Sequence, residues 1–360
     1  MKQVGICGNF GAYQDIANGQ MIKTKVLTQE LEEYFGKENI SIVDTYLWSK
    51  NPIKLLLQCF RLVILCKNII ILPAHNGIKI FAPLFKILCK IFNRKLHYSV
   101  IGGWLPEFLS SNPRILKSVR SMDGVYVETK SMKEKLINLG INNVIYMPNF
   151  KKINIVDIKK IKKNHTVPYK LCTFSRVKKE KGIIDAINAV NKINDELNKI
   201  VFTLDIYGTI EEDFKAEFKN AIDRSNKSCT YKGVIEFNNT TEVLKDYFAL
   251  VFPTYYEGEG FPGTIIDSFS SGLPVIATDW KYNSEIISNK KNGLIYKRTK
   301  ENKEQGLTDI LNKVYDNPEI ITSMKNDCIL EAKKYNPSHA MSYMIDKMED
   351  KYSEKKNRTC

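Results

Sequence analysis

Short apolar runs alternate with amphipathic helical patterns along this chain, and no other feature of the sequence constrains the fold as strongly. Parallel strands need long crossover connections, so strand–helix alternation predicts a parallel sheet with helices on both faces. In the first half of the chain, the predicted strands are residues 4–7, 41–44, 68–72, 96–101, 124–127 and 143–146. The helices predicted between them are residues 19–35, 52–67, 81–92 and 131–139.

The alternation stops in the Lys- and Asn-rich segment 151–168, which lacks clear periodicity and is interpreted as a linker. It then begins again, with predicted strands at residues 171–174, 202–207, 230–231, 250–252 and 275–278. Helices are predicted at residues 182–193, 214–224, 241–247 and 264–271, and helices alone are expected from there to the tail.

A chain of 360 residues is long enough for two domains, each with its own core. We therefore predict an α/β protein with two Rossmann-like, doubly wound domains, residues 1–150 and 169–335, that face an interdomain cleft. Residues 336–360 form a helical tail that can pack back on the first domain.

The positive charge of the chain is confined to its first half. The formal net charge is +14, and residues 1–168 carry all of it, whereas residues 169–360 are balanced. The predicted helices 52–67 and 81–92 mix Leu, Ile and Phe with Lys and Arg. Either they are core helices with a solvated basic rim, or they present a face to an anionic membrane leaflet. The one-sided charge favours the membrane, and no recognition motif points to nucleic acid.

Cysteine, histidine and aspartate usage excludes several kinds of site. The eight cysteines include no C-x-x-C pair, which is typical of a reduced cytosolic chain. The four histidines lie far apart and no D-x-D pair occurs, so neither a zinc site nor a metal–diphosphate clamp is expected. The first apolar run is too short for a signal peptide, and basic residues interrupt every stretch long enough to span a bilayer.

The stretch that begins at Gly258 matches a dinucleotide-binding fingerprint by count alone. Three glycines have the spacing G-x-G-x-x-G, and Asp279 lies 21 residues beyond the first. Glu259, however, puts a carboxylate where that fingerprint brings a pyrophosphate against the backbone, and Pro262 removes an N–H donor. The motif also comes late in its domain. These points reject a nicotinamide dehydrogenase, and an ordinary strand–helix turn remains the plain alternative.

Two carboxylates and two cations support a different interpretation. Glu259 in the loop and Asp267, about one turn into the next helix, can both face a ligand at the helix N-terminus. The first could hold sugar hydroxyls and the second a ribose diol. In the segment TFSRVKKEKG, Arg176 and Lys181 flank a loop at a strand's carboxyl end, which suits a departing diphosphate. Taken singly, Asp267 is also explained by the helix dipole, and the basic loop by solvation.

Together these segments resemble the family 4 glycosyltransferases, which are retaining enzymes of the GT-B fold. The family's context G-R-x-x-x-E-K-G corresponds to residues 175–182, with Ser175 in the place of the glycine. Its E-G-F-P and G-x-P-V-I-A-T segments match residues 259–262 and 272–278, and its second acid, a Glu, is Asp267 here. The first half of the chain resembles the family only loosely.

The resemblance implies a role for each of these side chains. Arg176 and Lys181 would grip the donor diphosphate, Glu259 and the backbone of residues 260–263 would hold the transferred sugar, and Asp267 would bind ribose. The complete predicted site is Glu259, Arg176, Lys181, Gly260, Phe261, Pro262, Gly263, Thr264, Asp267 and, from a Gly-rich first turn, Gly11. The histidine that many members carry after an N-terminal strand has no counterpart after residues 96–101, and His75 is a weaker candidate.

The resemblance therefore predicts a retaining glycosyltransferase without metal or other cofactor, cytoplasmic and peripheral on the inner face of the plasma membrane. It would move sugar from a nucleotide-sugar, with a UDP-sugar expected, to a growing, lipid-linked bacterial surface glycan such as capsule or lipopolysaccharide. No protein base is needed, because the departing phosphate oxygen can take the acceptor proton. Another GT-B enzyme, an epimerase or phosphorylase, and a non-catalytic sugar-nucleotide binding protein remain alternatives.

Overall fold

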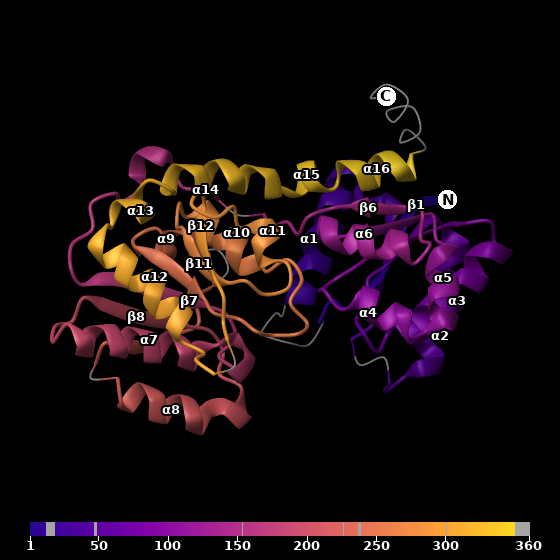
Figure 1. The fold of residues 1–360 in the computed structure, drawn as a ribbon. Helices are drawn as coiled ribbons and strands as arrows, with labels where there is room; N and C mark the ends of the chain where they lie inside the picture. The colour runs from indigo at the N-terminus through magenta and orange to yellow at the C-terminus, as the bar shows by residue number, and fades with distance from the viewer. Residues whose placement is uncertain are drawn as a thin grey trace. The chain divides into compact units, whose positions relative to one another are not determined.

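In the computed structural model, the chain divides into two compact units, each built on its own parallel sheet (Figure 1). Unit 1 comprises Met1–Lys152 and Tyr335–Cys360, and unit 2 comprises Ile153–Lys334. The structure describes residues 1–11, 19–46, 49–152, 154–225, 227–236, 239–299 and 301–349. The last part of the predicted tail, residues 350–360, lies outside the described residues.

The sheet of unit 1 has six strands in the order β2-β1-β3-β4-β5-β6, and all neighbouring strands are parallel. The strands are β1 Lys2–Gly8, β2 Ile40–Asp44, β3 Cys66–Ile71, β4 Lys95–Ser99, β5 Gly124–Val127 and β6 Val144–Tyr146. His97 lies in the fully buried middle of β4, with its ring nitrogens near Asn68 Oδ1 at 3.3 Å and the Tyr126 hydroxyl at 3.1 Å. That histidine therefore supports the sheet.

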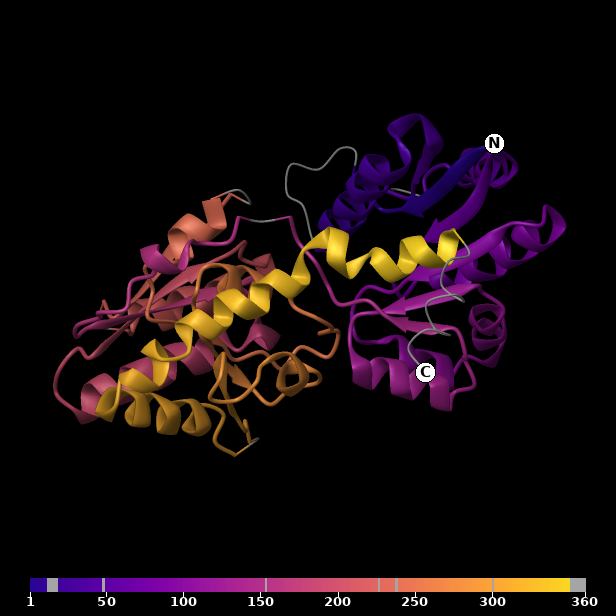
Figure 2. The same ribbon diagram turned by 90° about the horizontal axis from the view of Figure 1, so that it is seen from above.

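Helices cover both faces of this sheet. Leu27 of α1 and Met344 of α16 share a core cluster with Ile6 of β1. The next residue along from that face, Gly5, lies against Leu62 of α2, so α2 covers the opposite face, since successive strand residues point to opposite sides. The helices of unit 1 are α1 Gly19–Phe35, α2 Pro52–Leu65, α3 Ile78–Ile91, α4 Leu105–Ser110, α5 Pro113–Arg120, α6 Lys130–Asn138, α15 Pro337–Ala340 and α16 Ser342–Met348. The helices near the C-terminus are yellow in Figure 2, and the last two of them, α15 and α16, belong to unit 1.

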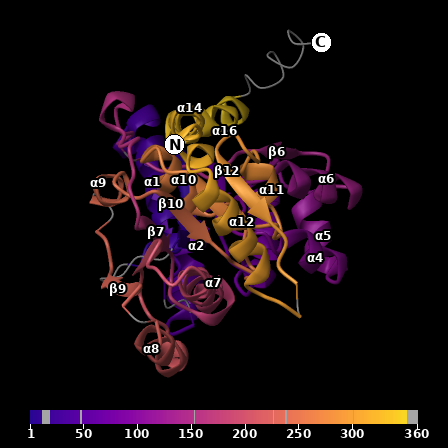
Figure 3. The ribbon, with the colours of Figure 1, turned by 60° about the vertical axis from the view of Figure 1, so that its left-hand side comes forward.

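Unit 2 repeats this design with the strand order β12-β11-β10-β7-β8-β9, again parallel throughout (Figure 3). The strands are β7 Tyr169–Phe174, β8 Phe202–Tyr207, β9 Cys229–Gly233, β10 Ala249–Phe252, β11 Val275–Thr278 and β12 Gly293–Tyr296. The prediction of helices alone after residue 278 is wrong, because β12 pairs with β11 at the edge of the sheet. A strand of four residues, GLIY, is too short for its periodicity to stand out from a turn.

The helices of unit 2 also form two layers. Ile187 of α7 and Leu311 of α12 share one core cluster with Leu204 of β8, whereas α9, α10 and α14 pack together on the opposite side of the sheet (Figure 1). The helices are α7 Ile183–Glu196, α8 Lys215–Asp223, α9 Thr240–Leu244, α10 Gly263–Ser270, α11 Asn283–Ile286, α12 Gln305–Asp316, α13 Glu319–Thr322 and α14 Lys325–Ala332. Two doubly wound α/β units were predicted, and that fold class is confirmed.

Some local structure lies outside what periodicity predicts. Helices α4 and α5 are not predicted, because each spans at most eight residues and Pro in the first turn gives it the look of a loop. The segment interpreted as a linker is packed on unit 2: Val156 and Ile161 are buried beside Ile329, and the Val156 amide donates to the Ser270 carbonyl at 2.9 Å.

Each sheet has one point at which the chain reverses its direction of winding. In unit 1, β1 is followed by β2 on one side and by β3 on the other. In unit 2, the chain moves outward from β7 to β9 and then returns to place β10 on the other side of β7. Loops at the carboxyl ends of the two strands at such a switch point diverge and leave room for a ligand. The strand order therefore directs attention to the loops after β7 and β10, and after β1 and β3.

The cysteines of the described chain are free and buried, all seven of them. Burial raises the pKa of the Cys172 and Cys328 thiols, which keeps both protonated at neutral pH. Within the described ranges, no helix combines the length and the apolar character needed to cross a bilayer.

Lys325, the first residue of α14, is fully buried, and its ammonium donates to the Tyr247 carbonyl at 3.2 Å. Burial lowers the pKa of Lys325 from 10.5 to about 8, because the interior disfavours the charged form. At a pH below about 8, the native state contains the buried, charged ammonium group of Lys325. It is then less stable than a native state with a neutral side chain at this position.

Lys325→Met should raise the free energy of unfolding at pH 7 by about 3 kcal/mol. Between pH 8 and 10.5 only the unfolded state keeps the Lys325 proton, so the disadvantage of the wild type should shrink as the pH rises. Urea unfolding of both proteins at several pH values across this window measures the difference. A difference that stays constant would contradict the lowered pKa.

Candidate functional site

The switch point of unit 2 brings together two loops that are distant in sequence, residues 175–182 after β7 and residues 253–263 after β10. We call these two loops the switch-point site. Gly182 has a φ of 70°, and a Cβ there would lie 2.1 Å from the Pro253 carbonyl oxygen, so only glycine lets the loops approach so closely. The Tyr255 amide donates to the Glu180 carbonyl at 2.8 Å and ties the loops together. The switch-point site is thus a single, fixed structure.

A buried ion pair lies at the centre of this site. Lys181 Nζ donates to Glu259 Oε2 at 2.6 Å, and both residues are 8% exposed. The same carboxylate oxygen accepts a hydrogen bond from the Thr254 hydroxyl at 2.9 Å. Because both side chains are buried, each has lost most of its hydration, and the opposite charge of its partner compensates for that loss. The carboxylate and ammonium that were predicted from separate motifs therefore form one unit.

Aromatic rings shape the cationic side of the site. The Tyr256 ring contacts two ammonium groups, with Lys178 Nζ 4.6 Å and Lys181 Nζ 5.2 Å from its centroid. Trp280, after β11, donates from Nε1 to the Tyr256 carbonyl at 2.9 Å and fixes that residue's backbone. These cation–π contacts add to the ion pairs that position both lysines, Lys181 with Glu259 and Lys178 with Glu180 and Glu211.

The loop after β10 ends at the start of helix α10. Gly260, Phe261 and Pro262 are buried, whereas Gly263 and Thr264, the first two residues of α10, are partly exposed. The Thr264 hydroxyl donates to the Phe174 carbonyl at 2.6 Å and joins the helix start to the end of β7. The backbone N–H groups of a first helical turn lack intrahelical acceptors and carry partial positive charge. Together with the lysines, they give this edge of the sheet groups that suit an anion.

Arg176 and Asp267, the other two charged residues of the predicted site, have contrasting environments. The Arg176 side chain is 55% exposed and its Nη1 donates to Glu211 Oε1 at 3.2 Å. Asp267 lies in the second turn of α10 and is 2% exposed, less than Glu259. Arg176 therefore lies where an entering ligand can reach it, whereas Asp267 is largely enclosed by protein.

Two further residues belong to unit 1: Gly11, which is part of the predicted site, and the weaker candidate His75. Gly11 follows β1 with a φ of 63°, and its amide donates to Asn9 Oδ1 at 3.1 Å. His75 follows β3, is exposed, and contacts the rings of Trp104 and Phe108 at centroid distances of 5.1 and 4.7 Å. Both lie at the switch point of the first sheet. The role predicted for Gly11 stays a prediction.

Several residues in or next to the switch-point site were not predicted. Lys178 lies in a segment already singled out, and Thr254 lies just before the other, but a motif that specifies neighbouring positions does not identify them. Arg298 follows β12, pairs through Nε with Asp185 Oδ2 at 2.7 Å, and stacks over the Tyr255 ring at 4.0 Å. It could not be predicted, because β12 itself was not.

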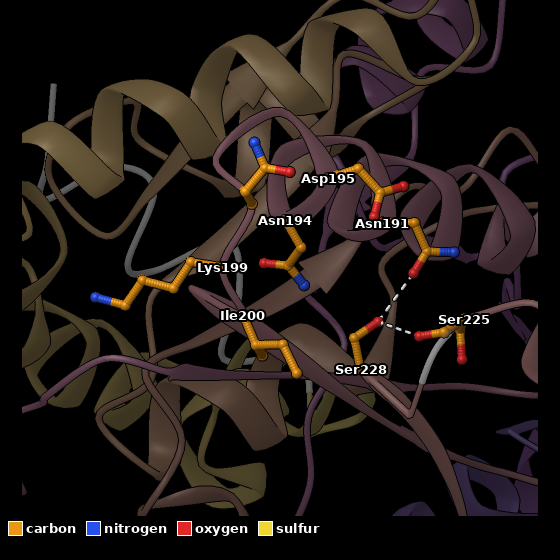
Figure 4. Close-up of a pocket in the computed structure, with 8 residues that line it drawn as sticks. Asn191, Asn194, Asp195, Lys199, Ile200, Ser225 and Ser228 are labelled. Atoms are coloured by element: carbon orange, nitrogen blue, oxygen red, sulfur yellow. Dashed lines mark hydrogen bonds between the residues drawn. The ribbon is translucent and has the colours of Figure 1, made fainter.

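A hollow of unit 2 lies away from this site. It has a volume of about 420 Å³ and lies beside the segments that precede β8 and β9, at the opposite edge of the sheet (Figure 4). Asn194 there accepts hydrogen bonds from the Val201 and Phe202 amides and donates to the Phe202 carbonyl, and Ser228 donates to Asn191 Oδ1 at 2.9 Å. Asn191, Asn194 and Ser228 are thus occupied by hydrogen bonds within the fold, so we assign the hollow a structural role.

The chemistry open to the switch-point site follows from this inventory. Cations and helix N–H groups can hold a diphosphate, and Glu259 can accept hydrogen bonds from hydroxyl groups. Among the residues that the structure describes, no group of three or more His, Cys, Asp or Glu side chains could hold a metal ion.

Comparisons with known proteins show which family residues 154–335 match. The family model described as "Glycosyl transferases group 1" matches residues 154–335, slightly more than half of the chain. The GtfA subunit of a UDP-N-acetylglucosamine–peptide N-acetylglucosaminyltransferase from Streptococcus agalactiae is 31% identical over 195 residues, 51% of this chain and 36% of GtfA. CapH of Staphylococcus aureus, a capsular polysaccharide biosynthesis glycosyltransferase, is 24% identical over 171 residues, 42% of this chain and 46% of CapH. The chain thus spans less than half the length of these relatives.

The complete fold is similar to that of solved structures. HepE from Anabaena, crystallised in complex with UDP, superimposes with a TM-score of 0.75 over 97% of this chain and 100% of HepE, at 15% identity. The GT-B fold that was predicted from the resemblance is therefore confirmed. At this identity the likeness shows the fold alone.

The ion pair of the switch-point site generates a prediction about stability. Lys181→Met should lower the free energy of unfolding by about 3–5 kcal/mol, because it leaves the Glu259 carboxylate buried without its partner. Lys181→Met combined with Glu259→Leu should recover most of that loss. Urea unfolding of both single variants and the double variant gives the coupling energy, and additive effects would show that the two side chains do not depend on each other.

Proposed function

This chain belongs to the group 1 glycosyl transferases, and from that premise we propose that it is a retaining, metal-independent enzyme of family 4 type. It takes a sugar from a nucleotide-sugar, with a UDP-sugar as the preferred donor, and adds it to a growing, lipid-linked bacterial surface glycan. The observation that carries this proposal is the switch-point site, where Lys181 and Glu259 meet beside the start of α10.

In the proposed complex, the donor diphosphate lies between cations and the helix start. Arg176 and Lys181 hold the diphosphate oxygens, and the backbone N–H groups near Gly263 and Thr264 add further donors. The negative charge on the leaving phosphate grows as the bond to the sugar breaks. These groups therefore stabilise the transition state more than they stabilise the donor in its ground state. Asp267 binds ribose hydroxyls. Because its side chain is only 2% exposed, the protein around it has to open slightly to admit the ribose.

Binding of the donor would also change the partner of Glu259. In the free protein, Lys181 neutralises this carboxylate at 2.6 Å. When the diphosphate draws on Lys181, Glu259 can accept hydrogen bonds from hydroxyls of the transferred sugar, together with the buried backbone of residues 260–262. The ion pair thus keeps both groups in place until the donor arrives.

The proposed reaction proceeds on one face of the sugar. The bond from the anomeric carbon to the phosphate oxygen breaks, and the acceptor hydroxyl oxygen forms its bond to that carbon on the same side. The departing phosphate oxygen takes the acceptor proton, so no side chain has to serve as a base. The anomeric configuration is therefore retained.

The setting of the reaction is proposed from the relatives and the charge. CapH is named for capsular polysaccharide biosynthesis, and GtfA for transfer of N-acetylglucosamine to a peptide. The excess of basic residues in the first half of the chain suits an acceptor presented at an anionic membrane. We therefore propose a cytoplasmic enzyme, peripheral on the inner face of the plasma membrane.

A panel of nucleotide-sugars tests the proposal. UDP-, GDP-, ADP- and dTDP-sugars are compared by the shift of the melting temperature, and the best binder is then assayed for transfer and for slow hydrolysis. An epimerase would convert the donor without an acceptor, a phosphorylase would require free phosphate, and a non-catalytic binding protein would show neither transfer nor hydrolysis. Stabilisation by NAD alone would contradict the assignment altogether.

Lys181→Met should weaken UDP binding by about 10- to 100-fold, because a charge-assisted contact to the diphosphate is lost. Lys179→Met is the matched control, since Lys179 is in the same loop but its side chain is 66% exposed and pairs with Glu217. Calorimetric titration of both variants measures the difference. Equal affinities in the two variants would remove Lys181 from the diphosphate site.

Asp267→Asn should raise the KM for the donor about 10-fold or more and leave kcat nearly unchanged, because ribose contacts do not change in the transition state. Asp267→Glu, which restores the family's residue, should keep donor binding. Steady-state kinetics with varied donor concentration give both constants. If Asp267→Asn lowers kcat at constant KM, the residue acts on the reacting centre and the ribose assignment fails.

A further inference from the structure

Helices α2 and α3 of unit 1 are apolar on both their inner and their outer faces. The inner residues of α2 are Leu55, Cys59, Leu62 and Val63, all buried. The outer residues Ile53, Leu57, Phe60 and Ile64 recur at helical spacing and are exposed, Ile53 by 75% and Leu57 by 65%. A surface helix of a water-soluble domain ordinarily places polar residues on that outer face.

The same pattern occurs in α3, and the two outer faces adjoin. Ile80, Ile87 and Ile91 are exposed, the last by 68%, while Phe81 and Phe85 of the same helix are buried. The Phe60 ring of α2 meets the ring of Phe92, directly after α3, at a centroid distance of 5.4 Å. We call the surface formed by the outer residues of both helices the α2–α3 face (Figure 1).

This face holds a large share of the exposed apolar side chains of the molecule. Of the twenty large hydrophobic residues that are exposed within the described chain, nine lie in α2 or α3. These nine are Ile53, Leu56, Leu57, Phe60, Ile64, Leu65, Ile80, Ile87 and Ile91. Single exposed apolar residues are ordinary, but a concentration of this kind marks a surface that binds a partner.

The charge around the α2–α3 face has one sign. The sequence contains no Asp or Glu between Asp44 and Glu107, a stretch that includes nine Lys and Arg residues. Lys54 and Arg61 are exposed and line, with Ile53 and Leu57, a hollow of about 380 Å³ along α2. Within the described ranges, neither Lys54 nor Arg61 forms an ion pair, so these cations are not neutralised by the protein.

We propose that the α2–α3 face binds the surface of a bilayer that contains anionic phospholipid, with both helices lying in the plane of the interface. Apolar side chains at the centre would enter the acyl boundary, and the basic side chains would contact phosphate headgroups. A second copy of this chain fits less well, because its own face carries the same positive charge and like charges would be brought together. The inference deepens the proposed function by naming the membrane surface of unit 1, yet binding to the bilayer requires neither donor nor turnover.

Two triple variants test the two contributions separately. Lys54→Gln, Arg61→Gln and Lys90→Gln together should lower the affinity for vesicles of phosphatidylcholine and phosphatidylglycerol by about 100-fold. Leu57→Ser, Ile87→Ser and Ile91→Ser together should lower it by at least about 10-fold. All six side chains are exposed, so the thermal unfolding of both variants should match that of the wild type.

Matched controls come from exposed residues of unit 2. Lys163→Gln, Lys199→Gln and Lys219→Gln remove the same charge, and Ile200→Ser, Val234→Ser and Leu330→Ser remove exposed apolar groups. Both control triples should sediment with the vesicles as the wild type does, and none of the proteins should bind vesicles of phosphatidylcholine alone.

The experiment distinguishes this proposal from its rivals. If the two α2–α3 variants sediment with anionic vesicles as well as their controls do, the proposal is overturned. It is also overturned if the wild type is a dimer by sedimentation velocity and the Leu57, Ile87 and Ile91 variant is a monomer, because a second copy would then be the occupant. Donor binding measured by calorimetry should be the same in all variants, so failure of the proposed function would be seen separately.

Discussion

The ion pair between Lys181 and Glu259 is the interaction on which the organisation of the switch-point site depends. It joins two loops whose residues are 78 positions apart in sequence, and it lies where the parallel sheet of unit 2 reverses its winding. A pair this buried is costly to break from either side, because the remaining charge has no water to replace its partner. Such a pair holds an ammonium and a carboxylate at fixed positions without ligand, which lowers the entropy lost when a ligand binds.

The two units differ in their charge and in their surfaces. In unit 2, Arg176, Lys178 and Lys181 lie in one loop near a helix start, and residues 169–360, which include most of this unit, are balanced in charge. The N-terminal part of unit 1 carries the excess positive charge, together with the exposed apolar residues of α2 and α3. A soluble, charged donor needs a small and well-defined anion site, whereas a lipid-linked acceptor needs a wide contact with a surface. The proposed function assigns these two requirements to different units.

The sequence was sufficient to predict much of the fold, because the alternation of strands and helices is a strong, repeated signal. The prediction failed at β12, whose four residues carry too little periodicity, and at α4 and α5, whose Pro-containing first turns look like loops.

Part of the site was also predicted, because Lys181 and Glu259 belong to motifs that can be recognised in the sequence. Their direct contact was not predictable, because it depends on strand order. The same reason applies to Arg298, which follows β12 and contacts Tyr255 of the loop after β10 and Asp185 of α7. The basic, apolar character of residues 52–67 and 81–92 was visible in sequence, but only burial shows which residues face outward.

Hydrogen exchange of the intact chain with and without UDP, read by mass spectrometry, tests the central claim most directly. If the diphosphate binds at the switch point of unit 2, slowed exchange should appear in the peptides that cover residues 175–182 and 258–267. Slowed exchange confined to the hollow lined by Asn191, Asn194 and Ser228, or no change anywhere in unit 2, would contradict the account.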